Sequence, residues 1–439
     1  MSKSAIYFFA EYPVEFAAWA GLAAIIREVR PDLTLTLIYA REKLSSNYEW
    51  DFILKRFDSA HEITRIAWAG NWRAGITGKN LYLSLRQGFP AARRVAAELK
   101  AISFQPDSLA FVFNGLTLNE MLFLRRIKSA AGVNSVLITE QRDDLLLSDY
   151  VPNYSQAYYF NLYSHFFGTA YLDMFWLRTK DGGTGQRDAR FRTRPADFVF
   201  RGIYAPKRCG LKRGQTFIPL YMKDRTPAAS SQSVVLFGQP FDWEPSLATD
   251  ACYHRYNELI DMIRTKHSGA RFVYKPHPGE TAEQRAKVDL KGFEVVDNLS
   301  SEALVMQDQT ISTTYAFTST SIFTAACLGV KSYFLFPLFD NKCVPEALMS
   351  RYEDYCRSEV HPEMCLRSVD NLMDNKNDYD PSDLQAHVRT SSIRMLEVLG
   401  VFDSLEDKDL EPGITVTPED RWGNGVHPWP LRRLGRIVR

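Results

Sequence analysis

The stretch AIYFFAEYPVEFAAWAGLAAIIREV (residues 5–29) contains the unit from which the fold is predicted. Residues 5–10 form a continuous apolar run, which is typical of a parallel strand buried on both faces. Residues 13–29 indicate a helix, with Pro13 in its first turn, where a missing N–H is tolerated. We therefore expect a strand that leads directly into a helix, which is the repeating unit of an α/β fold.

The same alternation continues along the first part of the chain. Further strands are predicted at 33–40, 108–115 and 134–140, and helices at 89–102 and 118–132. Strands that are separated by helices indicate a doubly wound parallel sheet.

Residues 150–205 differ in composition, being rich in aromatic residues and then in Arg, Gly and Asp. We expect an aromatic helical segment at 154–178, then a mobile loop, and a linker between domains near 201–215. A second series of elements follows the linker. Its predicted strands are at 233–240, 270–276, 292–298, 310–315 and 331–336, and its predicted helices at 248–267, 303–309 and 318–329.

The fold class is therefore α/β, with two Rossmann-like domains facing a cleft. We place them at residues 1–205 and 215–390, followed by a C-terminal helix and basic tail at 391–439. A length of 439 residues suits two domains of ordinary size. A two-domain periplasmic binding protein has a comparable organisation. We expect no signal peptide, however, because Glu11, Pro13 and Glu15 interrupt the apolar N-terminal run.

Composition argues against several classes of protein. The chain has 53 Lys and Arg against 52 Asp and Glu, so its net charge is close to zero and no nucleic-acid partner is expected. Any anionic ligand must be bound by a local cluster of positive charge. The six cysteines show no CxxC spacing, which argues against a zinc site or a disulfide framework and favours a reducing, cytoplasmic compartment. No apolar stretch reaches the roughly 18 uncharged residues that a membrane span requires.

Three loops of the second domain follow predicted strands, and they should open on the same edge of one parallel sheet. They are FGQPFDWE (237–244), YKPHPGE (274–280) and YAFTSTS (315–321). Lys275 and His277 supply a cation and an imidazole. Ser319, Thr320 and Ser321 supply hydroxyls at a helix start, where the free N–H groups favour an anion. Together these loops predict a phosphate site. The simpler alternatives are a Pro-rich exit loop with solvated side chains and a plain N-cap.

KPHP followed by TSTSIFTAACLG resembles the His-Pro and Ser-Ser/Thr motifs of bacterial CMP-sugar glycosyltransferases of the GT-B type. These include the bacterial sialyltransferases and the β-Kdo transferases of capsule and O-antigen assembly, and FGQP (237–240) favours the Kdo group. The resemblance covers residues 230–335. It implies that His277 contacts the departing phosphate with Lys275 close by. It also implies that Gln239 and the Ser319, Thr320 and Ser321 group bind the donor.

The resemblance also directs attention to two acids. A β-Kdo linkage formed from a CMP-β-Kdo donor retains configuration, and double displacement requires a carboxylate nucleophile. Asp242 follows the Gln-Pro motif and is the predicted nucleophile, with Glu244 as its competitor. The sialyltransferases place an Asp-Asp-Gly motif after a strand of the first domain, where this chain has VLITEQRDD (136–144). That departure leaves Glu140 as the candidate acid/base, and both acids have an alternative as solvated or capping carboxylates.

The sequence therefore predicts a metal-independent glycosyltransferase that transfers a CMP-activated ulosonic acid, Kdo above all, to a bacterial surface glycan or glycolipid. No cofactor is expected. The first rival is an inverting sialyltransferase that uses Glu140 or a nearby Asp as general base and gives Asp242 no covalent role. The second is a non-catalytic sugar-nucleotide or glycan-binding module. The basic tail, with Trp429, Leu431 and Arg432, suits peripheral contact with the inner membrane, and a solvated tail is the alternative.

Overall fold

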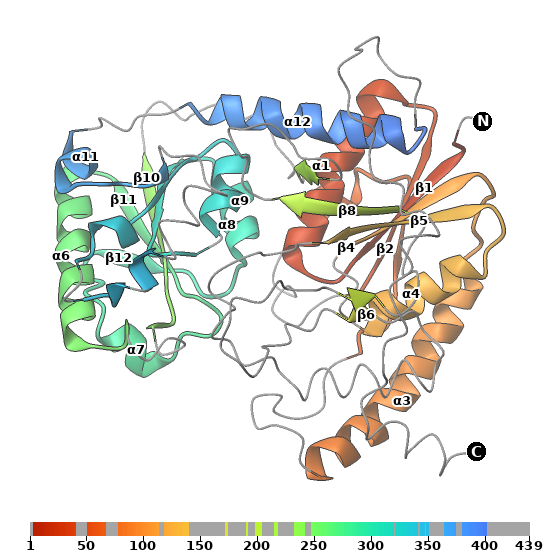
Figure 1. Ribbon diagram of the computed structural model, residues 1–439, viewed down its shortest axis with the longest axis horizontal. Coiled ribbons are helices and arrows are strands. Elements are labelled where there is room, and N and C mark those ends of the chain that lie inside the picture. Colours follow the sequence, from red (N-terminus) through yellow and green to blue (C-terminus); the bar gives the residue numbers. More distant parts are fainter. Residues whose placement is uncertain are drawn as a thin grey trace.

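The fold is taken from a computed structural model of the chain (Figure 1). It describes residues 3–40, 51–66, 78–113, 118–139, 172–173, 190–191, 198–203, 215–217, 232–241, 247–319, 321–340, 343–346, 348–350, 364–374 and 380–401. Two α/β bodies lie side by side in Figure 1, each built on its own sheet.

The first sheet has seven parallel strands in the order β3-β2-β1-β4-β5-β8-β9. The chain thus starts in the middle of the sheet, builds outward to one side and then returns to build the other. Its strands are β1 (Ala5–Ala10), β2 (Thr34–Tyr39), β3 (Ser59–Glu62), β4 (Ser108–Phe113), β5 (Val133–Thr139), β8 (Phe198–Ile203) and β9 (Gln215–Phe217).

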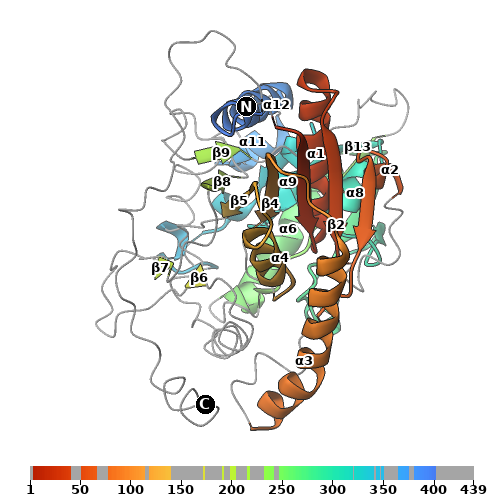
Figure 2. The same ribbon diagram turned by 90° about the vertical axis from the view of Figure 1, so that its right-hand side faces the viewer.

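Helices cover both faces of this sheet. Because side chains alternate along a strand, Phe8 of β1 packs in the cluster that contains Trp19 of α1, whereas Phe9 packs in the cluster with Leu99 and Phe123. The indole N–H of Trp19 donates to the Phe9 carbonyl at 2.6 Å. The helices are α1 (Pro13–Val29), α2 (Asp51–Leu54), α3 (Gly78–Ala101) and α4 (Leu118–Lys128), and Figure 2 shows α3 reaching away from the sheet.

The second sheet repeats the same plan with five parallel strands in the order β12-β11-β10-β13-β14. Its strands are β10 (Ser233–Phe237), β11 (Arg271–Lys275), β12 (Phe293–Val295), β13 (Ile311–Ala316) and β14 (Lys331–Phe334). The accompanying helices are α6 (Asp250–Lys266), α7 (Ala282–Ala286), α8 (Ser301–Gln307), α9 (Ser321–Cys327), the 3-10 turn η6 (Phe336–Leu338), α11 (Val369–Met373) and α12 (Pro381–Val398).

Both strand orders reverse at the first strand of their sheet, which is the doubly wound Rossmann arrangement. The prediction of two Rossmann-like α/β domains is therefore confirmed. In each domain the reversal creates a switch point, between β1 and β4 in the first sheet and between β10 and β13 in the second. Ligands of such sheets bind beyond the carboxyl ends of the strands at this point.

The structure differs from the sequence interpretation at the borders of the domains. The strands β8 and β9 extend the first sheet past residue 205, because FVFRGI and QTF pair parallel with β5 and with each other. The helix α12 begins at Pro381 and crosses the expected border at 390. Within the expected aromatic helix, Leu172–Asp173 form β6, which pairs antiparallel with β7 (Arg190–Phe191). Cys365 is disulfide-bonded, although no disulfide framework was predicted.

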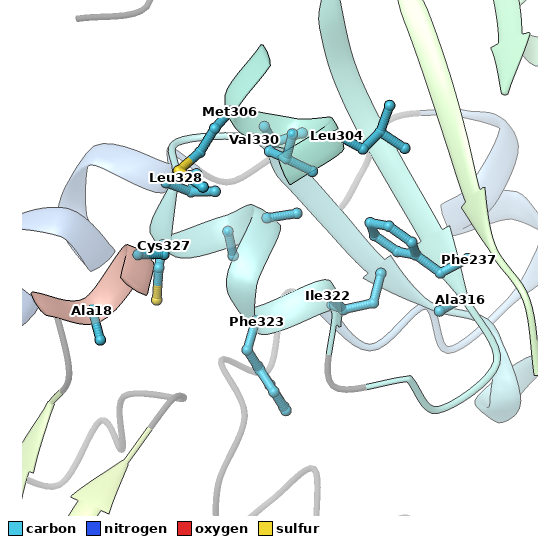
Figure 3. Close-up of a cluster of buried hydrophobic side chains, with 14 of the residues drawn as sticks. Ala18, Phe237, Leu304, Met306, Ala316, Ile322, Phe323, Cys327, Leu328 and Val330 are labelled. Atoms are coloured by element: carbon cyan, nitrogen blue, oxygen red, sulfur yellow. The ribbon is translucent and has the colours of Figure 1, made fainter. Parts of the chain in front are cut away.

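The two domains are joined by packing as well as by the chain. The helix α12 runs along both in Figure 1 and contacts α9 on one side and β9 and α1 on the other. Arg389 of α12 pairs with Glu28 of α1 at 2.5 Å. One buried cluster contains Ala18 of α1 together with Met306 of α8 and Cys327 of α9, as Figure 3 shows. None of the helices in the described ranges is long and apolar enough to cross a membrane.

Candidate functional site

The predicted phosphate loops meet at the switch point of the second sheet. Gly238 directly follows β10, and its N–H donates to the Lys275 carbonyl at 2.8 Å, which ties the first loop to the second. A Cβ at Gly238 would lie 2.6 Å from the Tyr274 hydroxyl oxygen and 3.0 Å from the His277 backbone nitrogen. Only glycine permits this approach, because real Cβ atoms do not come so near.

A third loop reaches the same point from β13. The Thr318 hydroxyl donates to the Gln239 side-chain oxygen at 3.3 Å, which joins the exits of β10 and β13. Gln239 is half-buried there. The structure therefore brings together residues that lie far apart in the sequence, as the three-loop interpretation requires.

His277 has a defined protonation pattern in its loop. Its Nδ1 accepts the backbone N–H of Gly279 at 3.0 Å, so the neutral ring carries its proton on Nε2. Burial, together with the nearby positive charge of Lys275, lowers the pKa of His277 to about 4. At neutral pH the imidazole is therefore an uncharged ring whose Nε2–H is a hydrogen-bond donor.

Lys275 differs from the exposed cation that its position at the end of β11, next to a Pro-rich loop, suggests. It is only 6% exposed, and its Nζ donates to the Pro276 carbonyl at 2.8 Å. Burial lowers the pKa of Lys275, while the negative charges of Glu302 and Asp297 oppose this shift. The positive charge of the Lys275 side chain therefore lies beneath the loop and acts on it electrostatically.

Hydroxyl groups form a short chain where α9 begins. The Ser321 N–H and the Ser319 hydroxyl lie 3.3 Å apart, and the Ser319 hydroxyl donates to the Ser321 hydroxyl at 3.2 Å. The Ser321 hydroxyl in turn donates to Ser301 of α8 at 2.9 Å. Because α9 has only seven residues, hydroxyl groups rather than a long helix dipole give this edge its polar character.

Several predicted residues lie outside the described part of the chain. These are Asp242, its competitor Glu244, Glu140 and Thr320. Their proposed roles stay predictions. Gln239, Lys275, His277, Ser319 and Ser321 are described, and all five lie at the ends of β10, β11 and β13.

Sequence reasoning missed two polar partners of this site, Glu280 and Ser301. Glu280 accepts the backbone N–H of His277, and a carboxylate three residues after a polar residue is the spacing of a capping box, which could have indicated it. Ser301 has no comparable signal. It meets Ser321 only because α8 and α9 pack together.

The switch point of the first sheet carries buried acids that the sequence analysis did not single out. Glu11 follows β1, Glu15 lies in the first turn of α1 and Glu120 in the first turn of α4, and each is at most 2% exposed. Glu15 accepts the N–H groups of Glu11 at 2.6 Å and of Tyr12 at 3.1 Å. Burial, followed by the charge of Glu120, raises the pKa of Glu15 well above its ordinary value.

This raised pKa predicts how Glu15→Gln changes stability. Ionised Glu15 is penalised in the folded state, so its contribution falls as pH rises above the ordinary value of 4.5 and through the raised pKa. Glutamine keeps the acceptor oxygen and cannot ionise. We expect the variant to gain about 1 kcal/mol or more in unfolding free energy at pH 8 and almost nothing at pH 4, below the ordinary value. Urea unfolding at both pH values measures this.

The matched control for that experiment is Glu28→Gln on the exposed side of the same helix. Its side chain pairs with Arg389, and Glu28→Gln should not be more stable than wild type at either pH. A Glu15→Gln variant that is less stable than wild type at both pH values would show that the carboxylate is held ionised.

Within the described residues, no group of three or more His, Cys, Asp or Glu side chains is arranged to hold a metal ion.

Comparison with known proteins gives no family assignment. No protein-family model matches the chain, and no curated protein matches it. Solved structures of similar architecture include a putative UDP-N-acetylglucosamine 2-epimerase from Listeria monocytogenes, at 11% identity and a TM-score of 0.46, covering 95% of this chain and 100% of that one.

Two glycosyltransferases are also among the similar structures. Medicago truncatula UGT71G1, complexed with UDP-glucose, has 12% identity and a TM-score of 0.41, covering 91% of this chain and 98% of that one. Streptomyces sp. SF2575 SsfS6, complexed with thymidine diphosphate, has 11% identity and a TM-score of 0.43, covering 90% and 99%. At these values the likeness carries no argument about what this chain binds or does.

Proposed function

We propose that this protein is a glycosyltransferase that takes its sugar from a nucleotide donor and holds the donor phosphate at the second switch point. The observation that carries the proposal is the meeting of three strand-end loops there, with a fixed Nε2–H donor on His277 and hydroxyls on Ser319 and Ser321. Ligands of doubly wound sheets bind at this place.

The chemistry of these groups suits a phosphate ester. Neutral N–H and O–H donors can bind phosphate oxygens, and the Ser319 and Ser321 hydroxyls can do so by rotating away from the bonds that they make to Ser321 and Ser301. A donor fixed in advance stabilises the charge that develops as the nucleotide leaves. The buried charge of Lys275 adds a positive potential, and burial weakens its screening by salt. The site therefore provides electrostatic stabilisation of a leaving phosphate through the chain's own groups.

The finer proposal is that the donor is a CMP-activated ulosonic acid and that Kdo is the sugar. It rests on the Gln-Pro, His-Pro and Ser/Thr motifs. In this reaction the Asp242 carboxylate attacks the anomeric carbon and CMP leaves. An acceptor hydroxyl then displaces the carboxylate, with Glu140 taking its proton. The acceptor is a surface glycan or lipid-linked glycan, and the basic tail contacts an anionic membrane surface.

The donor proposal predicts that CMP stabilises the protein. A ligand that binds only the folded state, at about 100 times its Kd, adds about 2.7 kcal/mol. We expect CMP to raise the Tm in a thermal-shift titration, and UDP, GDP and NAD to raise it far less. Equal shifts with UDP would contradict the choice of CMP, and no shift with any nucleotide would contradict the proposed function.

Ser319→Ala supplies a site-specific version of the same titration. Loss of one hydrogen bond costs about 1 kcal/mol, so CMP should bind about fivefold more weakly. The exposed Ser268, in the turn after α6, gives the matched control Ser268→Ala, which should bind CMP as wild type does.

The three alternative functions are distinguished by the product that forms, since all of them include binding of CMP. Incubation with CMP-Kdo and with CMP-sialic acid, in the presence of acceptor, should release CMP and form a product of retained configuration from CMP-Kdo. An inverted product from CMP-sialic acid would support the sialyltransferase alternative. CMP binding without any transfer would support the binding module.

A further inference from the structure

The loop that carries His277 is closed by bonds within itself. The Glu280 N–H donates to the His277 carbonyl at 2.9 Å, which makes residues 277–280 a tight turn. Inside the turn, the Gly279 N–H donates to His277 Nδ1 at 3.0 Å. The His277 N–H donates in return to Glu280 Oε2 at 3.3 Å. The Glu280 side chain therefore holds the first residue of the turn, and the His277 side chain holds the backbone of its third residue.

Glu280 also ties this turn to the sheet. The Tyr274 hydroxyl donates to Glu280 Oε1 at 2.6 Å, and Tyr274 is a fully buried residue of β11. The turn lies against Gly238, where a Cβ would be 2.7 Å from Glu280 Oε2 and 3.0 Å from the His277 nitrogen. The carboxylate of Glu280 is thus the link between a rigid strand and the loop that presents the imidazole.

The charges around Glu280 come from several elements. Burial raises the pKa of Glu280, and this shift is opposed by the Tyr274 hydrogen bond, by Arg285 of α7 and by Lys275 of β11. Tyr256 of α6 is near enough for its phenol to be affected by the charge of Glu280. Further out, Glu302 of α8 and Asp297 act on Lys275. Glu280 therefore balances Lys275 and Arg285 within a largely buried group of polar side chains.

We propose that Glu280 is a positioning residue, which holds the 277–280 turn so that His277 keeps one orientation and a single tautomer, with its proton on Nε2, for binding of the donor phosphate. The part that concerns the phosphate rests on the proposed function. The part that concerns the imidazole rests on the bonds of the turn. Glu280 would act through His277, whose backbone N–H it accepts.

Loss of the carboxylate should free the ring. Without an acceptor for the His277 N–H, the turn loosens and the Gly279 N–H no longer holds Nδ1 in place. The imidazole can then place its proton on either nitrogen, since the two tautomers of a free ring differ little in energy. A donor that is present only part of the time, and in several orientations, binds a phosphate more weakly.

The test uses Glu280→Gln, with Glu283→Gln as matched control. Glutamine has one side-chain acceptor oxygen, so it cannot accept from both the Tyr274 hydroxyl and the His277 N–H as Glu280 does. Glu283 is an exposed acid in the first turn of α7, three residues away. Histidine labelled with ¹⁵N reports the tautomer directly, and the His277 signals are assigned among the eight histidines by comparison with His277→Ala.

We expect wild type and Glu283→Gln to show His277 with a bare Nδ1 and a protonated Nε2. In Glu280→Gln the two nitrogen signals should move toward each other, and CMP should bind roughly fivefold to tenfold more weakly. Tyr274→Phe removes the anchor of the same carboxylate and should change both readouts in the same direction, which serves as a second variant if Glu280→Gln folds poorly.

Unchanged His277 nitrogen signals in both variants would overturn the proposal, whatever the affinity for CMP. Failure of the proposed function gives a different pattern. In that case wild type would bind neither CMP nor UDP, and Glu280→Gln would still lose the single tautomer of His277. This result would support the positioning role of Glu280 and contradict the binding of a nucleotide phosphate by His277.

Discussion

His277→Ala is expected to lower turnover of the CMP-sugar donor by about 10²–10³-fold, because it removes a fixed hydrogen-bond donor from a leaving phosphate. The Nε2–H of a neutral ring costs no reorganisation when charge develops, since Gly279 already holds Nδ1. The loss should appear in kcat more than in the folding free energy. Initial rates of CMP release from CMP-Kdo, with saturating donor, measure it.

His254→Ala is the matched control for this variant. His254 lies on α6 with its side chain 80% exposed, 3.2 Å from Glu258, and it should turn over donor as wild type does. A His277→Ala enzyme with near-normal turnover would return the Lys-Pro-His-Pro loop to its simpler interpretation as a solvated exit loop.

The low pKa of His277 adds a pH readout. Since the folded pKa of about 4 lies below the ordinary 6.5, the neutral ring stabilises the fold above pH 6.5, and this contribution is lost as pH falls from 6.5 to about 4. His267, whose pKa burial also lowers to about 4, adds a loss in the same window. The turnover profile should accordingly show no ionisation of His277 above about pH 5.

The elements that the sequence predicted well are those buried on both faces. Strands β1 and β10 lie within predicted strands, because continuous apolar runs are typical of buried parallel strands. Strand β13, with sequence ISTTYA, extends its prediction by one residue and is rich in the β-branched residues that favour strands. The edge strand β3, with sequence SAHE, was missed because most of its residues are exposed and polar. The strand β8 was missed because its FVFRGI run lies between Arg- and Gly-rich stretches that indicate a linker.

The sequence predicted which loops form the candidate site, but it did not predict which of their side chains are buried. The order of strands places the ends of β10, β11 and β13 on one edge, and alternation of strand and helix was enough to expect that. Which side chains are buried there depends on three-dimensional packing. Lys275 ends β11 next to a Pro-rich loop, which suggests a solvated cation, yet its side chain is buried. Glu280 likewise accepts from the buried Tyr274 and lies against Gly238, which the sequence does not indicate.

The case for Asp242 as nucleophile begins with the residue before it. Phe241 is 1% exposed and its ring packs edge-on against Tyr253 at 5.3 Å, Tyr256 at 5.4 Å and Phe317 at 5.2 Å. Phe317 follows β13, so the chain that leads into Asp242 is anchored between α6 and the exit of β13. That is the switch point that holds His277 and Ser319, and a nucleophile for a sugar bound through its phosphate belongs beside it.

Asp242→Asn should therefore fold and bind CMP as wild type does and lose sugar transfer by about 10⁴-fold or more, because an amide is a poor nucleophile. Wild type quenched during turnover of CMP-Kdo should carry the sugar as an ester on the peptide that contains Asp242, detected by its mass. Asp250→Asn, an exposed acid at the start of α6, is the matched control and should transfer normally. A product of inverted configuration, or full activity in Asp242→Asn, would rule out double displacement at this residue and leave Glu140 as the acid on which transfer depends.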